Sequence, residues 1–246
     1  MPRPPQSVAS LKRSSIAAVL AVAGLAVIAT PASAQDFWQS FKVSPASTLD
    51  LRNKNGTIRV KGRRKTNTVV ISAKTTSGDA RVEAERAPDG TIQVEVKGHG
   101  TVNFDIEVPE STNLRLLSFR GSMHISHSSG AIKASILNDG SIELIDLQSP
   151  SVEAHSANGN VVFKGAMLPT GRYALKTFSG SVEATLPAGS DFKLVAKSVQ
   201  GGMDLGKFPL NFGKRTDQLV EGTCGAGRAS LSLWTQEGVI RLHSEP

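Results

Sequence analysis

One short phrase recurs along the chain and restricts the folds it can adopt: Gly, any residue, an apolar residue, any residue, an apolar residue. It begins at nine glycines: Gly56, Gly90, Gly121, Gly130, Gly140, Gly159, Gly180, Gly201 and Gly238. The chain is 39% apolar, so two specified apolar positions would coincide by chance only about 15% of the time. The residue between them is polar in every phrase except the one at Gly159, which has Val162. This period of two predicts a strand with one buried and one solvated face after each glycine.

A turn is expected before each of these strands. The residue preceding the glycine is often Asn or Asp, as at Asn55, Asp89, Asp139 and Asn158. Asn or Asp followed by Gly suits a turn that needs positive φ. The same dipeptides mark β-hairpins, so an antiparallel sandwich or meander is the alternative all-β fold.

The spacing of the glycines favours a β-solenoid over hairpins. Gly121, Gly130 and Gly140 are 9 and 10 residues apart, and Gly159, Gly180 and Gly201 are 21 and 21 apart. A rung of about 20 residues suits a solenoid, because each coil stacks its apolar side chains on those of the next. This register predicts one buried row formed by Ile142, Val161, Val182 and Met203.

The part of the chain before Gly121 is less regular. Residues 49–51, 68–71 and 102–108 read as longer strands. Solenoids need atypical ends that protect their open edges, and Pro109 marks a plausible start of the regular coils. We therefore expect an N-terminal β cap over residues 35–109 and solenoid repeats over residues 110–246.

The first 34 residues read as a signal peptide. Lys12 and Arg13 precede an apolar run over residues 16–28, and Ala32-Ser33-Ala34 forms a small-residue cleavage site before Gln35. The run of about 13 residues is short of the ~20 that cross a bilayer. We expect cleavage after Ala34, no transmembrane span in the mature chain, and a periplasmic, extracellular or cell-surface location.

The net charge limits the kinds of binding partner that we expect, and the cysteine content limits the disulfides. Removing the three cations of the signal leaves 25 basic and 21 acidic residues, a net charge of +4 that is too mild to favour nucleic acid. The run over residues 61–65, Lys-Gly-Arg-Arg-Lys, could meet lipid or polyanion phosphates, although a solvated turn is the simpler interpretation. Cys224 is the only thiol, which excludes an internal disulfide.

Three segments give the sequence a family resemblance. These are residues 108–114, Val-Pro-Glu-Ser-Thr-Asn-Leu, which lead into the phrase at Gly121; the serial Ser-Gly, Asp-Gly and Asn-Gly turns; and residues 237–242, Glu-Gly-Val-Ile-Arg-Leu. The chain from Phe41 onward resembles the bacterial "putative adhesin" β-strand-repeat family. The resemblance implies a right-handed parallel β-helix outside the cytoplasm, with no established active site. Ser, Thr, Ala or Asn mostly replaces the family's Asp after the turn glycine, which argues against a continuous acidic row.

No catalytic residue, cofactor or metal site is predicted. The zinc-hydrolase, Walker and serine-hydrolase motifs are absent from the sequence. His124, His127 and His155 could be considered as metal ligands, but His124 and His127 would point to opposite faces of a strand. A rung of 21 residues would place Glu183 and Asp204 about 4.8 Å apart on neighbouring coils. That pair could act as a carboxylate dyad or bind a cation, or could simply belong to a solvated face.

The sequence thus predicts an exported, non-enzymatic β-repeat protein that acts as a structural or interaction module, adhesin-like, at the cell envelope or surface. Its partner would be an unidentified envelope or surface component, either a protein or a polysaccharide. The alternative is a β-helix that binds or processes polysaccharide, which a groove of acids and aromatic residues would favour. Trp38 with Phe37 and Phe41 is expected instead to form a hydrophobic cap on the coils.

Overall fold

The computed structural model describes residues 36–245, and every regular element in that range is a β-strand. The expected signal peptide, with its cleavage residues Ala32, Ala34 and Gln35, lies outside the described residues. Sheet A contains, in spatial order, β1 (Asp36–Lys42), β4 (Thr68–Gly78), β7 (Gly100–Pro109), β3 (Ile58–Arg63), β9 (Met123–Ser126), β11 (Ile142–Ile145), β13 (Val161–Lys164), β15 (Val182–Pro187), β21 (Ile240–Glu245) and β17 (Met203–Asp204). Sheet B contains β18 (Leu210–Arg215), β19 (Leu219–Cys224), β16 (Phe192–Gln200), β20 (Ala229–Glu237), β14 (Arg172–Ser179), β12 (Ser151–Asn158), β10 (Ile132–Asp139), β8 (Asn113–Arg120), β2 (Thr48–Asn55), β6 (Ile92–Lys97) and β5 (Arg81–Arg86).

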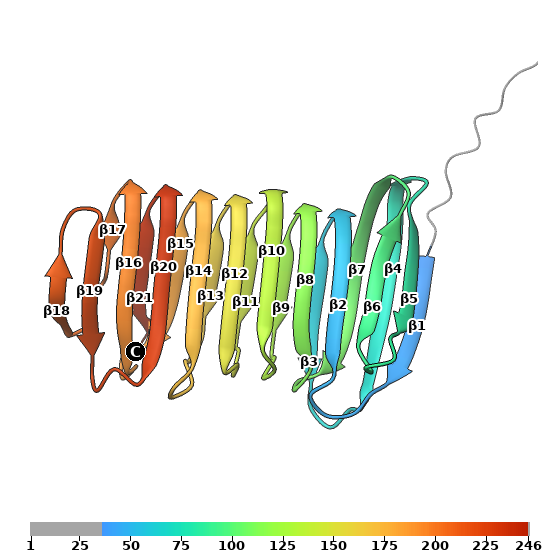
Figure 1. The fold of residues 1–246 in the computed structure, drawn as a ribbon, viewed down its shortest axis with the longest axis horizontal. Helices are drawn as coiled ribbons and strands as arrows, with labels where there is room; N and C mark the ends of the chain where they lie inside the picture. Colours follow the sequence, from blue (N-terminus) through green and yellow to red (C-terminus); the bar gives the residue numbers. More distant parts are fainter. Residues whose placement is uncertain (1–35, 246) are drawn as a thin grey trace, which may run out of the picture. The chain divides into compact units, whose positions relative to one another are not determined.

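The two sheets are the two sides of a β-solenoid. Each coil consists of one strand in sheet B and the next strand in sheet A, and successive coils pair in parallel, as in β8–β9, β10–β11 and β12–β13 (Figure 1). Alternate residues of the coil strands, except the two-residue β17, are buried, so the inward side chains of both sheets form one core. The predicted solenoid is confirmed. Among residues 36–245, antiparallel pairing occurs only at the two ends, between β1, β4 and β7, between β5 and β6, and between β16, β19 and β18.

The order of the coils in space differs from their order in the chain. The last coil, β20–β21, lies between β14–β15 and β16–β17. At the other end, β2–β3 lies between β6–β7 and β8–β9. Within the expected cap, residues 35–109, the structure therefore contains both antiparallel strands and two coils of the parallel stack. The first and last coils of the chain are each paired on both sides.

The insertion of the last coil changes the predicted core row. Ile142, Val161 and Val182 are aligned on neighbouring strands and fully buried, as the sequence predicts. The next residue in the row is Ile240, because β21 occupies the free edge of β15. Met203 follows Ile240 and is only partly buried. The expected contact between Val182 and Met203 is therefore wrong.

Seven of the nine glycines of the repeated phrase stack at the turn from sheet B to sheet A, and Gly90 and Gly130 lie outside this stack. Gly140 has φ 153°, and a Cβ there would lie 1.6 Å from the carbonyl oxygen of Gly121. The same close approach links, in order along the stack, Gly56, Gly121, Gly140, Gly159, Gly180, Gly238 and Gly201. Buried hydroxyls bind several of these carbonyls, including Thr177 Oγ1 to Gly159 O at 2.7 Å and Thr235 Oγ1 to Gly180 O at 2.9 Å. Only glycine lets the coils approach this closely, which explains why it recurs.

Candidate interaction surfaces

The outer face of sheet A carries a row of charged side chains that follows the strand pairing. In register order the row is Asp105, Arg59, His124, Glu143, Val162, Glu183, Arg241 and Asp204. His124 Nδ1 lies 2.9 Å from Glu143 Oε2, and Arg241 Nη1 donates to Glu183 Oε1 at 2.7 Å. Opposite charges face each other across strands, which is an arrangement typical of a solvated sheet face.

The expectation that Glu183 and Asp204 lie on neighbouring strands is wrong. Both residues are aligned with Arg241, one on each side, because β21 lies between β15 and β17. Two strand spacings, roughly 9.6 Å, separate their positions instead of one. The Arg241 guanidinium already compensates the Glu183 carboxylate at the point where a shared cation would bind. The structure therefore does not form the acid pair.

The three histidines considered as metal ligands do not converge. His124 is bonded to Glu143 on sheet A, and His127 follows β9 with its Nε2 3.8 Å from Asp146. His155 lies on β12 in sheet B. Among residues 36–245, no group of three or more His, Cys, Asp or Glu side chains is arranged to hold a metal ion.

The basic run over residues 61–65 is partly neutralised. Arg63, the last residue of β3, pairs with Glu107 on the neighbouring strand β7, and Arg64 Nε lies 3.2 Å from Oε2 of Glu110, which follows β7. The ion pair also raises the pKa of Arg63, through its hydrogen bond with Glu107 and then the charge of that carboxylate. Residues 61–63 end strand β3, and only Arg64 and Lys65 lie in the exposed turn, so the interpretation of the whole run as a solvated turn is correct for its last two residues alone.

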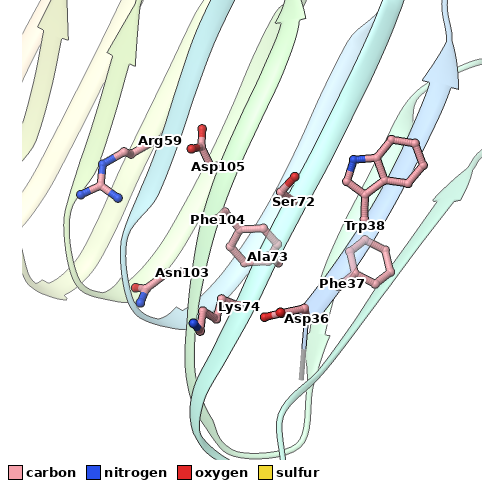
Figure 2. A pocket seen from close by; sticks show the side chains of 10 residues that line it. All are labelled: Asp36, Phe37, Trp38, Arg59, Ser72, Ala73, Lys74, Asn103, Phe104 and Asp105. Carbon is pink, nitrogen blue, oxygen red and sulfur yellow. The ribbon is translucent and has the colours of Figure 1, made fainter. Parts of the chain in front are cut away.

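A groove of about 360 Å³ lies beside the exposed indole of Trp38 (Figure 2). Its walls come from β1, β4, β7 and β3: Asp36, Phe37, Trp38, Arg59, Ser72, Ala73, Lys74, Asn103, Phe104 and Asp105. Phe37 and Phe41 pack against the core, as expected of a hydrophobic cap. Trp38 points to the other face of β1 and is 68% exposed, so it does not belong to that cap. Alternation along the strand separates it from its two aromatic neighbours.

The four charged side chains that line the groove form no ion pair among residues 36–245. Asp36 is aligned with Lys74, and Asp105 with Arg59, yet none of the four forms an ion pair within 4.0 Å inside residues 36–245. Two carboxylates and two cations line the groove with balanced charge: Asp36 and Lys74 lie on the two strands nearest the indole, and Asp105 and Arg59 lie two and three strands away from Trp38. Such a groove offers hydrogen-bond donors and acceptors beside an aromatic platform, which suits a neutral polyhydroxylated ring.

The outer face of sheet B exposes an apolar row, defined here as Phe119, Leu137, Ala157 and Phe178. The buried residues that precede them, Ser118, Ile136, Ser156 and Thr177, are aligned on β8, β10, β12 and β14. The exposed fractions of Phe119, Leu137 and Phe178 are 50%, 54% and 49%. Our interpretation of the sequence missed this row. Its signal is an apolar residue two positions before the turn glycine, or three before Gly140, where β10 contains a bulge.

Cations are in excess behind the apolar row. The outward, exposed cations of β8, β10, β14 and β16 are Arg115, Lys133, Arg172, Lys176, Lys193 and Lys197. Three exposed carboxylates lie on β8, β10, β12, β14, β20 and β16. Glu153 of β12 lies 3.3 Å from Lys133, Asp139 at the end of β10 lies 3.3 Å from Arg120 at the end of β8, and Glu237 is the last residue of β20. The strands of the same coils in sheet A are β9, β11, β13, β15, β21 and β17. They carry more carboxylates than Lys and Arg residues, so the two faces differ in the sign of their net charge.

The chain is similar to known proteins in both sequence and fold. A family model described as Toastrack DUF4097 matches residues 47–243. A putative cell adhesion protein from Clostridium sporogenes has a solved structure that is 11% identical, with a TM-score of 0.49, covering 86% of this chain and all of that one. A putative adhesin from Bacteroides fragilis is 12% identical, with a TM-score of 0.44, covering 86% and 97%. No curated protein matches the chain.

Residues 36–245 contain no apolar helix of membrane-spanning length.

Proposed function

The chain belongs to the Toastrack DUF4097 family, and on that premise we propose that it is an exported, non-enzymatic interaction module of the cell envelope or surface. The membership confirms the family resemblance given by the repeated phrase. A stack of coils locked by close glycine contacts presents rigid, regularly spaced side chains on its two faces. Such a scaffold is suited to holding a contact surface.

The apolar row on sheet B is the observation that carries this proposal. Aromatic and aliphatic side chains that are about half exposed on neighbouring strands form a contiguous patch, which costs solvation unless a partner covers it. Contiguous exposed apolar patches of this kind mark interaction sites more often than scattered apolar residues do. The contact surface proposed here is the outer face of sheet B.

Site-specific crosslinking in cells tests this assignment. A photoreactive amino acid at Leu137 of sheet B is compared with one at Lys164, which is exposed on the opposite face. We expect crosslinked adducts in the envelope fraction from position 137 and few from position 164. Equal yields from the two faces, or adducts from position 164 alone, would contradict the assignment.

Export is the second part of the proposal and has its own test. Cleavage after Ala34 would leave Gln35, or its cyclised form, at the N-terminus of the native protein. Mass spectrometry of protein from the periplasmic, surface and culture fractions should find that end. Recovery of the intact chain with Met1 from the cytoplasm would reject export.

The groove beside Trp38 favours saccharide binding as a second candidate function. The groove combines an exposed indole with two carboxylates and two cations that form no ion pair among residues 36–245, so it is a groove of acids and aromatic residues. Titration with oligosaccharides prepared from envelope polysaccharide should shift the tryptophan emission in a saturable way. Trp38→Ala should abolish the shift, whereas Trp234→Phe on sheet B serves as the control and should keep it. A shift that follows Trp234 would reject the groove.

A further inference from the structure

The apolar row and the cations of sheet B have a fixed arrangement in space. β8, β10, β12, β14, β20 and β16 run parallel, so their ends meet at one edge of the sheet (Figure 1). The apolar row occupies that edge, because Phe119 and Phe178 are each the last residue but one of their strands. Lys176 lies two residues, about 7 Å, behind Phe178, and Arg172 lies about 20 Å behind it.

The cations also spread across the sheet. Lys176 and Lys197 flank Trp234 on adjacent strands, and Arg115 is aligned with Lys133. Five spacings of about 4.8 Å separate β8 from β16, so the six cations, called here the basic field, spread over roughly 24 Å. Among the described residues, the only ion pair formed by the six cations is the one between Lys133 and Glu153. Most of the field therefore remains available to an external anion.

An apolar edge backed by a broad basic field has the chemistry of a peripheral membrane site. Apolar side chains enter the boundary between headgroups and acyl chains, while Lys and Arg lie against lipid phosphates. An anionic polysaccharide would satisfy the cations but would leave the apolar row in water. An acidic protein patch would pair with the cations, but it would need an apolar strip of its own at the same edge to cover the row, whereas a bilayer supplies both phosphates and an apolar layer in one surface. The combination therefore favours a lipid surface.

We infer that the outer face of sheet B docks onto an anionic lipid bilayer, with the apolar row inserted at the headgroup boundary and the six cations against the phosphates. The inference rests on the proposed function, because it names the partner of the same face. Sheet A faces away in this orientation. Its outward residues on the matching strands include Glu143, Glu183 and Asp204, which an anionic surface would repel.

Co-sedimentation of the mature chain with lipid vesicles tests the inference. The probes are vesicles of phosphatidylglycerol and phosphatidylcholine in equal parts, and vesicles of phosphatidylcholine alone. We expect binding to the anionic vesicles that weakens as salt is added, because exposed charges are screened, and little binding to the neutral ones. Equal binding to both kinds of vesicle, or to neither, would overturn the inference.

Three double variants locate the contact. Lys176→Glu with Lys197→Glu reverses the field of sheet B, and Phe119→Ser with Phe178→Ser removes the apolar row; each should weaken binding by about tenfold or more. Lys61→Glu with Lys164→Glu makes the same charge change on sheet A and should leave binding within about twofold. All six positions are exposed. Circular dichroism melts of the three variants check that each one folds. Equal loss in the sheet A control would reject the assigned face.

Two further outcomes separate this inference from its alternatives. If dextran sulfate binds as well as the anionic vesicles do, and the Phe119 and Phe178 substitutions have no effect, the partner is a polyanion and the lipid inference fails. If crosslinks form at Leu137 in cells while vesicles do not bind, the contact face stands and only its lipid partner is wrong. If position 137 gives no adducts but the vesicles bind as described, the lipid inference stands without the crosslinking result.

Discussion

Arg241 donates a 2.7 Å hydrogen bond from Nη1 to Oε1 of Glu183, although 58 residues separate the two in the chain. The bond exists because the last coil inserts beside β15 instead of adding to the end of the stack. Exposed fractions of 40% and 32% leave both side chains partly solvated, so the pair itself contributes little stability. Its importance is that it reports the position of β21.

The inserted coil should be required for folding. Ending the chain after Arg228 removes β20 and β21 and leaves β14 and β16 without their shared partner, together with the buried contacts of Leu231, Leu233 and Ile240. We expect this truncation to lose the cooperative thermal transition and to aggregate through its free edges. Ending the chain after Leu242 keeps the coil and should retain a cooperative melt. Similar circular dichroism melts for the two truncations would contradict the inserted topology.

The glycine stack should tolerate no side chain. Gly140→Ala places a methyl group within 1.6 Å of the Gly121 carbonyl in a region of φ that alanine rarely adopts. We expect a loss of about 2 kcal/mol or more in the free energy of unfolding, because the neighbouring backbones must separate. Gly189 has no heavy atom within 4 Å of such a group, so Gly189→Ala should change stability by less than about 0.5 kcal/mol. Urea denaturation of both variants measures the difference.

Adjacent residues on β15 should respond in opposite ways. Val182 is fully buried between Val161 and Ile240, so Val182→Asp should cost several kcal/mol or prevent folding, since a carboxylate would enter the core unpaired. Glu183→Ala removes only a partly exposed ion pair and should cost about 1 kcal/mol or less. Equal melting temperatures for the two variants would reject the register of β15.

Acid should weaken the turn before β20 through Asp191. The backbone amide of Arg228 and then its guanidinium bind the Asp191 carboxylate and hold its pKa below the ordinary value of 3.8. The folded state therefore favours the charged form. Its contribution to stability is complete above pH 3.8 and is lost as the pH falls through the lower folded pKa. The difference in melting temperature between the native protein and Asp191→Asn should shrink from pH 6 toward pH 2; a constant difference would contradict this linkage.

Cys224 should be inert in the folded protein. Its side chain is buried, Sγ donates to the carbonyl oxygen of Ser190 at 3.2 Å, and burial, followed by the nearby charge of Asp191, raises the thiol pKa. Little thiolate is therefore available at neutral pH. Iodoacetamide should label Cys224 slowly in buffer and rapidly in denaturant, as followed by mass spectrometry. Fast labelling under native conditions would contradict the burial of this residue.

The sequence interpretation did not predict either of the two surfaces proposed for binding. Trp38 lies next to Phe37 in the sequence, and only its placement on the outer side of β1, across from Ser72, exposes it to the groove. Phe119 and Phe178 are far apart in the chain. They share one face because parallel pairing aligns Ser118 with Thr177 through the two strands between them.

The sequence by itself determined the solenoid, because its two signals are local: alternation with a period of two sets which side chains face inward, and Gly-containing turns set where each strand begins. It also placed Ile142, Val161 and Val182 correctly in one row. Only the tertiary structure decided the order of the coils. The apolar edges of successive coils resemble one another, so spacing alone cannot tell whether Gly201 or Gly238 stacks on Gly180. The structure selects Gly238, and with it places Arg241 between Glu183 and Asp204.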